Sequence, residues 1–191
     1  MNEVLFFIFD GMTDYEITFA MHMLATEGHK TIITIAYEDR LVNGRSGAVY
    51  KPHRLVSDQK NIEAEGLIIC GGWYGDYRDE LDVLIQHLNR KQKLTAGICG
   101  AGTVMLAKSG VLKNIPYTTP IIAWGSEHAK VFGTGDPFPR VNYVMKPVVH
   151  SGSVITGLGH AFIEFTIEIL DWFQLFSNAA EKDEFRQIMN G

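Results

Sequence analysis

The sequence predicts an α/β fold in which a mostly parallel sheet carries helices on both faces. Its strand-length apolar runs are continuous rather than alternating, which is typical of strands buried on both faces. Amphipathic segments of helix length separate several of these runs, as the crossover connections of a parallel sheet require. The chain has 191 residues and shows no internal repeat or linker, so we expect a single domain over residues 1–191.

The first predicted strand is residues 3–9 (EVLFFIF). A helix is predicted over residues 14–27, because apolar residues recur there at helical spacing. Thr13 and Glu16 fit a capping box at its start, and Gly28 stands where a helix-terminating glycine belongs.

The second predicted strand is residues 31–37 (TIITIAY). Asn43-Gly44 then marks a hairpin turn between two short strands, roughly 39–42 and 46–50. A third buried strand is predicted over residues 66–70.

The next predicted elements are a helix from about Asp79 to Lys91, a strand over residues 94–99 and a short helix over 103–109 that stops at Gly110. Residues 111–145 contain four prolines, which forbid long regular elements, and we assign them no structure.

Residues 147–156 are predicted to form two strands around Ser151-Gly152. An amphipathic helix follows over residues 161–176, and the charged tail from Ser177 is predicted to be helical.

Composition excludes several classes of function. Seventeen Lys and Arg against 22 Asp and Glu give a net charge of −5 without a basic stripe, so no nucleic-acid partner is expected. The first residues lack the basic region of a signal peptide, and no apolar run reaches the ~18 residues of a membrane span. We therefore expect a cytoplasmic protein without a membrane partner, in which two cysteines are too few for a disulfide framework.

Cys99 is the leading candidate for a reactive group. It stands where a buried strand meets a helix, with Gly97 before it and Gly100 and Gly102 after it, a pattern that resembles a nucleophile elbow. The helix N-terminus is expected to lower the pKa of the thiol by stabilising the thiolate. The alternative interpretation is a small core residue at the end of a strand.

Three further positions are candidates beside Cys99, because ligands bind beyond the carboxyl ends of parallel strands. Two backbone N–H groups could hold an oxyanion: that of Gly72, which follows Gly71, and that of Gly100, which follows Cys99. Glu16 could orient the sulfur, although it also fits the capping box with Thr13.

Among the seven histidines, His160 lies in the loop after a predicted strand on the same edge and is a candidate base. The alternative interpretation is a surface or helix-start residue, which is more common for a lone histidine in a loop. The sequence contains no HExxH or CxxC motif, so no metal site is expected. It also lacks a complete dinucleotide fingerprint and a phosphate-binding loop, so no cofactor is expected.

The motifs FDGMTDYE, IICGG, AGICGAG and ITGLGHAFIEFTIEIL, in this order, resemble the ThiJ/PfpI superfamily over nearly the whole chain. This superfamily includes the parkinsonism-associated deglycase and the PfpI-type intracellular proteases. The resemblance implies a flavodoxin-like three-layer α/β/α sandwich of the class I glutamine amidotransferase type, assembled as a homodimer.

By motif, Cys99 matches the family's reactive cysteine, Glu16 its acidic partner, and the amides of Gly72 and Gly100 its oxyanion positions. The sequence departs from the family at its histidines. Gly100 stands where PfpI-type proteases carry a histidine, and Thr119 of YTTP stands where the deglycase carries one. The late His and Glu pair of glutaminases is missing, and Cys70 replaces a proline that commonly precedes Gly-Gly.

Two functional hypotheses remain open. In the first, the protein is a cysteine-dependent hydrolase or hydratase that acts on a small electrophilic molecule through Cys99 and Glu16. In the second, Cys99 is the oxidisable thiol of a non-catalytic redox or stress sensor. A third interpretation, in which Cys99 is inert, is not separated from these by the residues alone.

Overall fold

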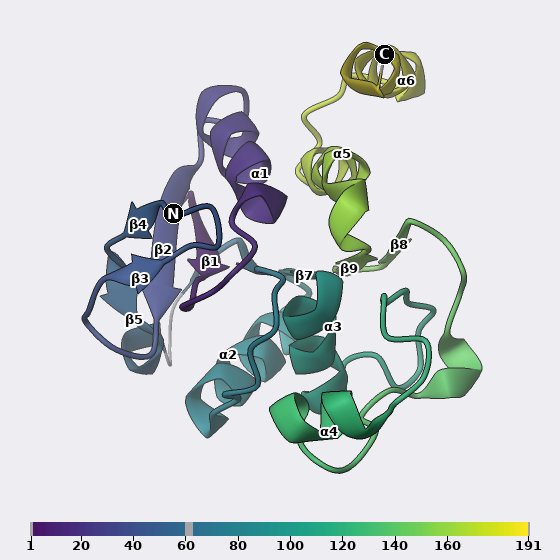
Figure 1. The fold of residues 1–191 in the computed structure, drawn as a ribbon. Helices are drawn as coiled ribbons and strands as arrows, with labels where there is room; N and C mark the ends of the chain where they lie inside the picture. Colours follow the sequence, from purple (N-terminus) through teal and green to yellow (C-terminus); the bar gives the residue numbers. More distant parts are fainter. Residues whose placement is uncertain (1, 60–62, 191) are drawn as a thin grey trace.

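A computed structural model describes residues 2–59 and 63–190, so the predicted domain over residues 1–191 extends beyond them at Met1, 60–62 and Gly191. Its centre is a seven-stranded sheet in the order β5-β2-β1-β6-β7-β9-β8 (Figure 1). The strands are β1 (Glu3–Phe7), β2 (Thr31–Ala36), β5 (Arg54–Leu55), β6 (Gly66–Ile69), β7 (Leu94–Ile98), β8 (Val148–Ser151) and β9 (Val154–Gly157). All neighbours pair in parallel except β8 and β9, which confirms the predicted mostly parallel sheet.

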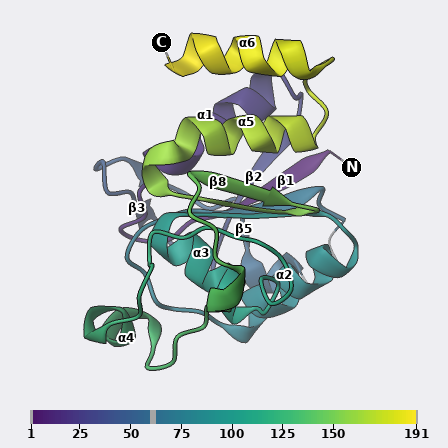
Figure 2. The same cartoon turned by 90° about the vertical axis from the view of Figure 1, so that its right-hand side faces the viewer.

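Helices cover both faces of this sheet (Figure 2). One face carries α1 (Tyr15–Thr26) and α5 (Phe162–Trp172), with α6 (Ala179–Asn190) packed outside α5. The other face carries α2 (Asp79–Arg90) and α3 (Cys99–Lys108), with α4 (Ser126–Phe132) beyond α3. The predicted three-layer sandwich is therefore confirmed.

Because helices cover both faces of the sheet, its central strands contain continuous apolar runs. The residues of β1 from Val4 to Phe7 are fully buried, as are Leu67 to Ile69 of β6. A strand with helices on both faces has no solvent side, and an alternating pattern would bury unpaired polar groups. The strand order reverses between β1 and β6, because the chain first extends the sheet to β2 and then returns.

The predicted hairpin is present as a separate two-stranded sheet, β3 (Val42–Asn43) and β4 (Val49–Tyr50), with shorter strands than expected. The predicted turn at Asn43-Gly44 is wrong in position, because Asn43 of β3 pairs with Val49 of β4 and the turn spans residues 44–48. Two predicted helices have different ends. The helix expected over 103–109 begins at Cys99, so the glycines form its first turn. The helix expected over 161–176 ends at Trp172, since Gln174 adopts a left-handed backbone conformation with φ 58°.

Sequence patterns did not reveal every element. Strand β5, the 3-10 segment Val56–Gln59 and helix α4 were unassigned, and all are too short for periodicity to detect. The 3-10 segments Arg140–Asn142 and Gly159–Ala161 are shorter still. Among the described residues, no helix has the length and apolar character needed to cross a membrane.

Candidate active site

Three strand ends bring the predicted site residues together. Glu16 follows β1 in the first turn of α1, Gly71 and Gly72 follow β6, and Cys99 follows β7. Because these strands are parallel neighbours, their carboxyl ends meet at one edge of the sheet. The sheet thus places side chains from three distant segments around one thiol.

Cys99 sits in a strained turn, as the nucleophile-elbow pattern predicts. Its φ is +60°, a left-handed conformation that a non-glycine residue adopts only when its surroundings enforce it. A Cβ atom on Gly97 would lie 2.5 Å from the carbonyl oxygen of Gly102, so the helix can approach the strand only because these positions are glycine. The Cys99 side chain is half-buried.

Glu16 faces Cys99 rather than forming the capping box. The N-cap of α1 is Asp14, and its end shows no side-chain cap hydrogen bond. The Glu16 carboxyl group, 2% exposed, is wedged between Gly71 and Gly159. A Cβ atom on Gly159 would overlap Glu16 Oε1 and lie 3.0 Å from Cys99 Sγ. Two glycines therefore make the space in which acid and thiol meet.

The electrostatics of the pair correct one prediction. Burial raises the pKa of Glu16 to about 7, although hydrogen bonding with Cys99 and Gly71 opposes this shift. Burial and the charge of Glu16 also raise the pKa of Cys99 to about 11, against the stabilising amides of Gly100 and Gly72. The predicted lowering of the Cys99 pKa by the helix N-terminus is wrong, because burial beside a carboxylate outweighs it.

The two predicted oxyanion amides lie at the thiol. The N–H groups of Gly100 and Gly72 both stabilise the Cys99 sulfur, which places them beside any atom that bonds to it. Gly100 is in the first turn of α3, where N–H groups have no partner within the helix. Gly72 is held by a β-bridge to Met12, with a φ of 139°.

Thr119 is fully buried behind the elbow. Its hydroxyl lies 2.8 Å from that of Thr103, which in turn donates hydrogen bonds to the carbonyl oxygens of Cys99 and Gly100 at 2.5 and 3.2 Å. The backbone N–H of Ile121 also donates to Thr119 Oγ1. Thr119 thus contacts the nucleophile turn through Thr103 and supports its backbone.

His160 is exposed and lines a different cavity, together with Lys146, Glu164 and Arg186. The histidine that lines the Cys99 cavity is His128 of α4, which sequence reasoning did not single out. Its ring lies between those of Trp73 and Trp124, with centroids 5.4 and 5.6 Å away. The segment WGSEH was the only signal available, in the region that its prolines left unassigned.

The cavity at Cys99 has a volume of about 260 Å³, and Gly72 and Gly100, the two predicted oxyanion glycines, line part of it. Its remaining lining comes from Thr13, Arg45, Trp73, Pro120, Ile121 and His128. Cys70, in contrast, is buried, and its thiol faces the Thr13 carbonyl oxygen at 3.5 Å. Burial raises the Cys70 pKa well above its ordinary value, so the two thiols differ in access.

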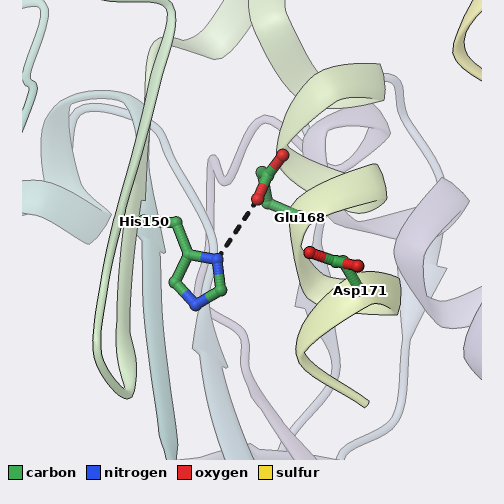
Figure 3. A group of neighbouring side chains, drawn as sticks. All are labelled: His150, Glu168 and Asp171. Atoms are coloured by element: carbon green, nitrogen blue, oxygen red, sulfur yellow. Dashed lines mark hydrogen bonds and ion pairs between the residues drawn. The ribbon is translucent and has the colours of Figure 1, made fainter. Parts of the chain in front are cut away.

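One group of potential metal ligands lies elsewhere, and the sequence spacing did not reveal it. His150 of β8 and Glu168 and Asp171 of α5 offer ligand atoms within 4.8 Å of one another (Figure 3). The Lys182 ammonium group contacts Glu168 at 2.7 Å and Asp171 at 2.9 Å. These two carboxylates therefore already share a cation from the protein itself, which links α6 to α5.

This chain is similar to known proteins along most of its length. The family model of the DJ-1/PfpI family matches residues 2–172. A comparison with curated protein sequences finds no match.

Solved structures share the fold over their full length. A DJ-1 superfamily protein from Agrobacterium tumefaciens has a TM-score of 0.82 at 22% identity, covering 98% of this chain and 97% of its own. DJ-1 from Toxoplasma gondii, in an oxidised form, has a TM-score of 0.75 at 18% identity, with 99% and 98% covered. An AraC family transcriptional regulator from Pseudomonas putida has a TM-score of 0.74 at 15% identity, with 99% and 100% covered.

These structures confirm the class I glutamine amidotransferase-like fold that the resemblance implied. Their identities are too low to carry an activity to this chain. The family model, in contrast, spans the sheet, both helical layers, Cys99 and Glu16. The chain belongs to the DJ-1/PfpI family.

Proposed function

We propose that the protein is a cysteine-dependent enzyme that hydrolyses or hydrates a small electrophilic molecule. The observation that carries this proposal is the contact between the Cys99 thiol and the buried Glu16 carboxyl group at a left-handed turn. A thiol with a raised pKa needs a base, and a carboxylate with a pKa of about 7 is poised to act as one near neutral pH.

In the proposed reaction Cys99 Sγ bonds to an electrophilic carbon of the substrate while Glu16 accepts the thiol proton. For a carbonyl substrate, the π electrons move to oxygen, where the amides of Gly72 and Gly100 stabilise the charge. Glu16 then returns the proton to the oxygen or the leaving group. Water releases the product from the sulfur in the final step and restores the thiol.

The test is consumption of a panel of small aldehydes, amides, esters and isonitriles by the purified protein. We expect at least one class to be consumed, and Cys99→Ala to abolish that activity while the thermal unfolding midpoint is retained. Cys70→Ala is the matched control, since its buried thiol takes no part. Equal turnover by Cys99→Ala would refute the proposal.

A second proposal is a redox sensor in which peroxide oxidises Cys99 to a sulfenic or sulfinic acid and is itself reduced to water. The half-exposed Cys99 beside a buried Cys70 favours selective oxidation of one thiol. Stoichiometric oxidation of Cys99, with no member of the panel consumed, would favour the sensor over the enzyme. The small substrate, a homodimer and a cytoplasmic location remain proposals.

A further inference from the structure

The Cys99 cavity has one positively charged wall. Arg45 lines it, and among the described residues that line it none carries a carboxylate. The volume of about 260 Å³ lies below the ~300–1,000 Å³ of sites for drug-sized ligands, so only a small molecule fits.

Arg45 is fixed by its backbone and not by its side chain. Its N–H donates to the carbonyl oxygen of Met12 at 2.8 Å, which ties the hairpin turn to the loop after β1. Within the part of the chain that the structure describes, its guanidinium group has no ion pair, whereas Arg40, Arg54 and Arg78 each pair with a carboxylate. The guanidinium group is therefore free to bind an anion that enters the cavity.

His128 supplies a second donor to the same cavity. Its Nδ1 accepts a hydrogen bond from the Gly125 N–H at 3.0 Å, so in the neutral ring the proton is on Nε2. With the amides of Gly72 and Gly100, the cavity offers several hydrogen-bond donors near the attacking sulfur, while the Glu16 carboxyl group that contacts the sulfur is 2% exposed and is not among the lining residues. Such a lining fits an oxygen-rich anion better than a neutral or cationic molecule.

We propose that Arg45 selects small carboxylates whose reactive carbon is next to the carboxylate, of which 2-oxo acids are the natural class. This inference rests on the proposed function, because Cys99 is its nucleophile. The guanidinium group binds the carboxylate and presents the carbonyl carbon to Cys99 Sγ. The S–C bond forms, the carbonyl π bond breaks, and the thiol proton passes through Glu16 to the oxygen. No oxidant or reductant is needed.

Iodoacetate and iodoacetamide test this without a known substrate, since they have nearly the same size and differ in charge. The rate of Cys99 alkylation by each is measured at pH 7 and low salt by peptide mass spectrometry, with glutathione as the free-thiol reference. We expect the iodoacetate to iodoacetamide ratio at Cys99 to exceed that of glutathione about fivefold, the effect of one exposed ion pair of about 1 kcal/mol.

Variants assign the effect to one residue. Arg45→Gln should reduce the ratio to that of glutathione, and Arg45→Lys should retain part of the preference. Lys51→Gln, at the residue just after the hairpin, also removes one positive charge. It should leave the iodoacetate to iodoacetamide ratio at Cys99 unchanged. A ratio equal to that of glutathione, or one unaffected by Arg45→Gln, would overturn the inference.

A second measurement uses the substrate class itself. Glyoxylate should protect Cys99 from iodoacetamide at a lower concentration than neutral methylglyoxal does, and Arg45→Gln should remove that difference. Anion preference without turnover of any compound would refute the enzyme and leave the selection by Arg45 standing. Turnover of neutral aldehydes with no effect of Arg45→Gln would refute the selection by Arg45 and leave the enzyme standing. If Cys99 reacts with neither iodoacetate nor iodoacetamide, both the enzyme and the selection by Arg45 are overturned.

Discussion

At the scale of single residues, the acidic group in contact with Cys99 is Glu16. Because the Cys99 pKa is raised to about 11, the resting thiol is neutral at pH 7 and needs a base. Glu16 is a base only when deprotonated, and burial raises its pKa to about 7. Reactivity should therefore increase with pH across the Glu16 titration, well below the pH at which the thiol ionises alone.

The first prediction concerns the acylation of Cys99 by p-nitrophenyl acetate. The reaction is measured by the nitrophenolate that it releases. The rate should rise with pH around a midpoint of about 7, and Glu16→Gln should remove this inflection and slow the reaction on the order of 10²-fold at pH 8. Glu27→Gln, an exposed change on the same helix, is the control. A Glu16→Gln profile identical to that of the unmodified protein would show that the thiol ionises without help.

Thr119 gives a second prediction at this scale. Thr119→Val keeps the shape of the side chain but leaves the buried Thr103 hydroxyl without its 2.8 Å partner. The free energy of unfolding should fall by about 1–2 kcal/mol in urea titrations. Thr26→Val, at the exposed end of α1, should change it by less than about 0.5 kcal/mol. Equal losses in both variants would show that the hydroxyl pair does not support the elbow.

Sequence alone predicted that Cys99, Glu16 and the two glycines lie together, because each follows a strand of a parallel sheet. It did not identify Arg45 or His128, since each reaches the cavity from a segment whose position only the tertiary structure sets. It also misjudged the Cys99 pKa. The local rule considers the helix N-terminus, whereas burial and the Glu16 charge come from residues far away in the sequence.

At the scale of elements, one carboxylate holds the hairpin that carries Arg45. Asp14, 4% exposed, accepts hydrogen bonds from the Ser46 N–H at 3.2 Å, the Ser46 hydroxyl and the Tyr50 hydroxyl at 2.8 Å. Burial tends to raise the Asp14 pKa, but these hydrogen bonds outweigh it and hold the pKa below its usual value. The anchoring is therefore complete above about pH 4 and is lost as pH falls below it.

This anchoring can be measured by trypsin, which cleaves after Arg45. Asp14→Ala should increase cleavage at Arg45 by about tenfold at pH 8, because the freed hairpin enters the protease more readily. Asp39→Ala, which removes an exposed carboxylate paired with Lys51, should not. If both variants are cut at the same rate as the unmodified protein, Asp14 does not hold the turn.

The elements that sequence predicted well have a regular burial pattern: the strands are mostly buried along their length, and helix α2 has one buried face. Strands β1, β2, β6 and β7 and helix α2 lie within two residues of their predicted ends. The errors fall where conformation depends on tertiary contacts: α3 begins at Cys99 because the elbow is enforced, and α5 ends early at a left-handed Gln174. Helix α4 lies among prolines and has only seven residues.

At the scale of the whole molecule, ion pairs link α6 to α5. Lys182 reaches Glu168 and Asp171 of α5, and Arg186 reaches Glu164 at 2.9 Å. His150 of β8 also contacts Glu168, at 3.2 Å. The family match ends at residue 172, so this outer helix lies beyond the matched region.

The charges that hold α6 set a pH window for its docking. Burial opposes ionisation of Glu168, but His150 and Lys182 outweigh it and lower its pKa to about 2. The contribution of the Glu168 carboxylate to the docking of α6 is therefore complete above about pH 4 and is lost as pH falls toward 2. The bond with Glu168 raises the His150 pKa, so the ion pair that links β8 to α5 is present at mildly acidic pH and is lost as pH rises through the His150 pKa.

Amide hydrogen exchange of residues 179–190 measures this docking without perturbing the site. Lys182→Gln should increase exchange in α6 by about tenfold, equivalent to about 1.4 kcal/mol, because Glu168 and Asp171 lose their shared cation. Exchange in β1 and β7 should not change, since α6 contacts α5 and not the sheet centre. Lys130→Gln, on the exposed side of α4, is the matched control. Unchanged α6 exchange in Lys182→Gln would mean that apolar contacts, such as that between Phe176 and Phe185, hold the helix instead.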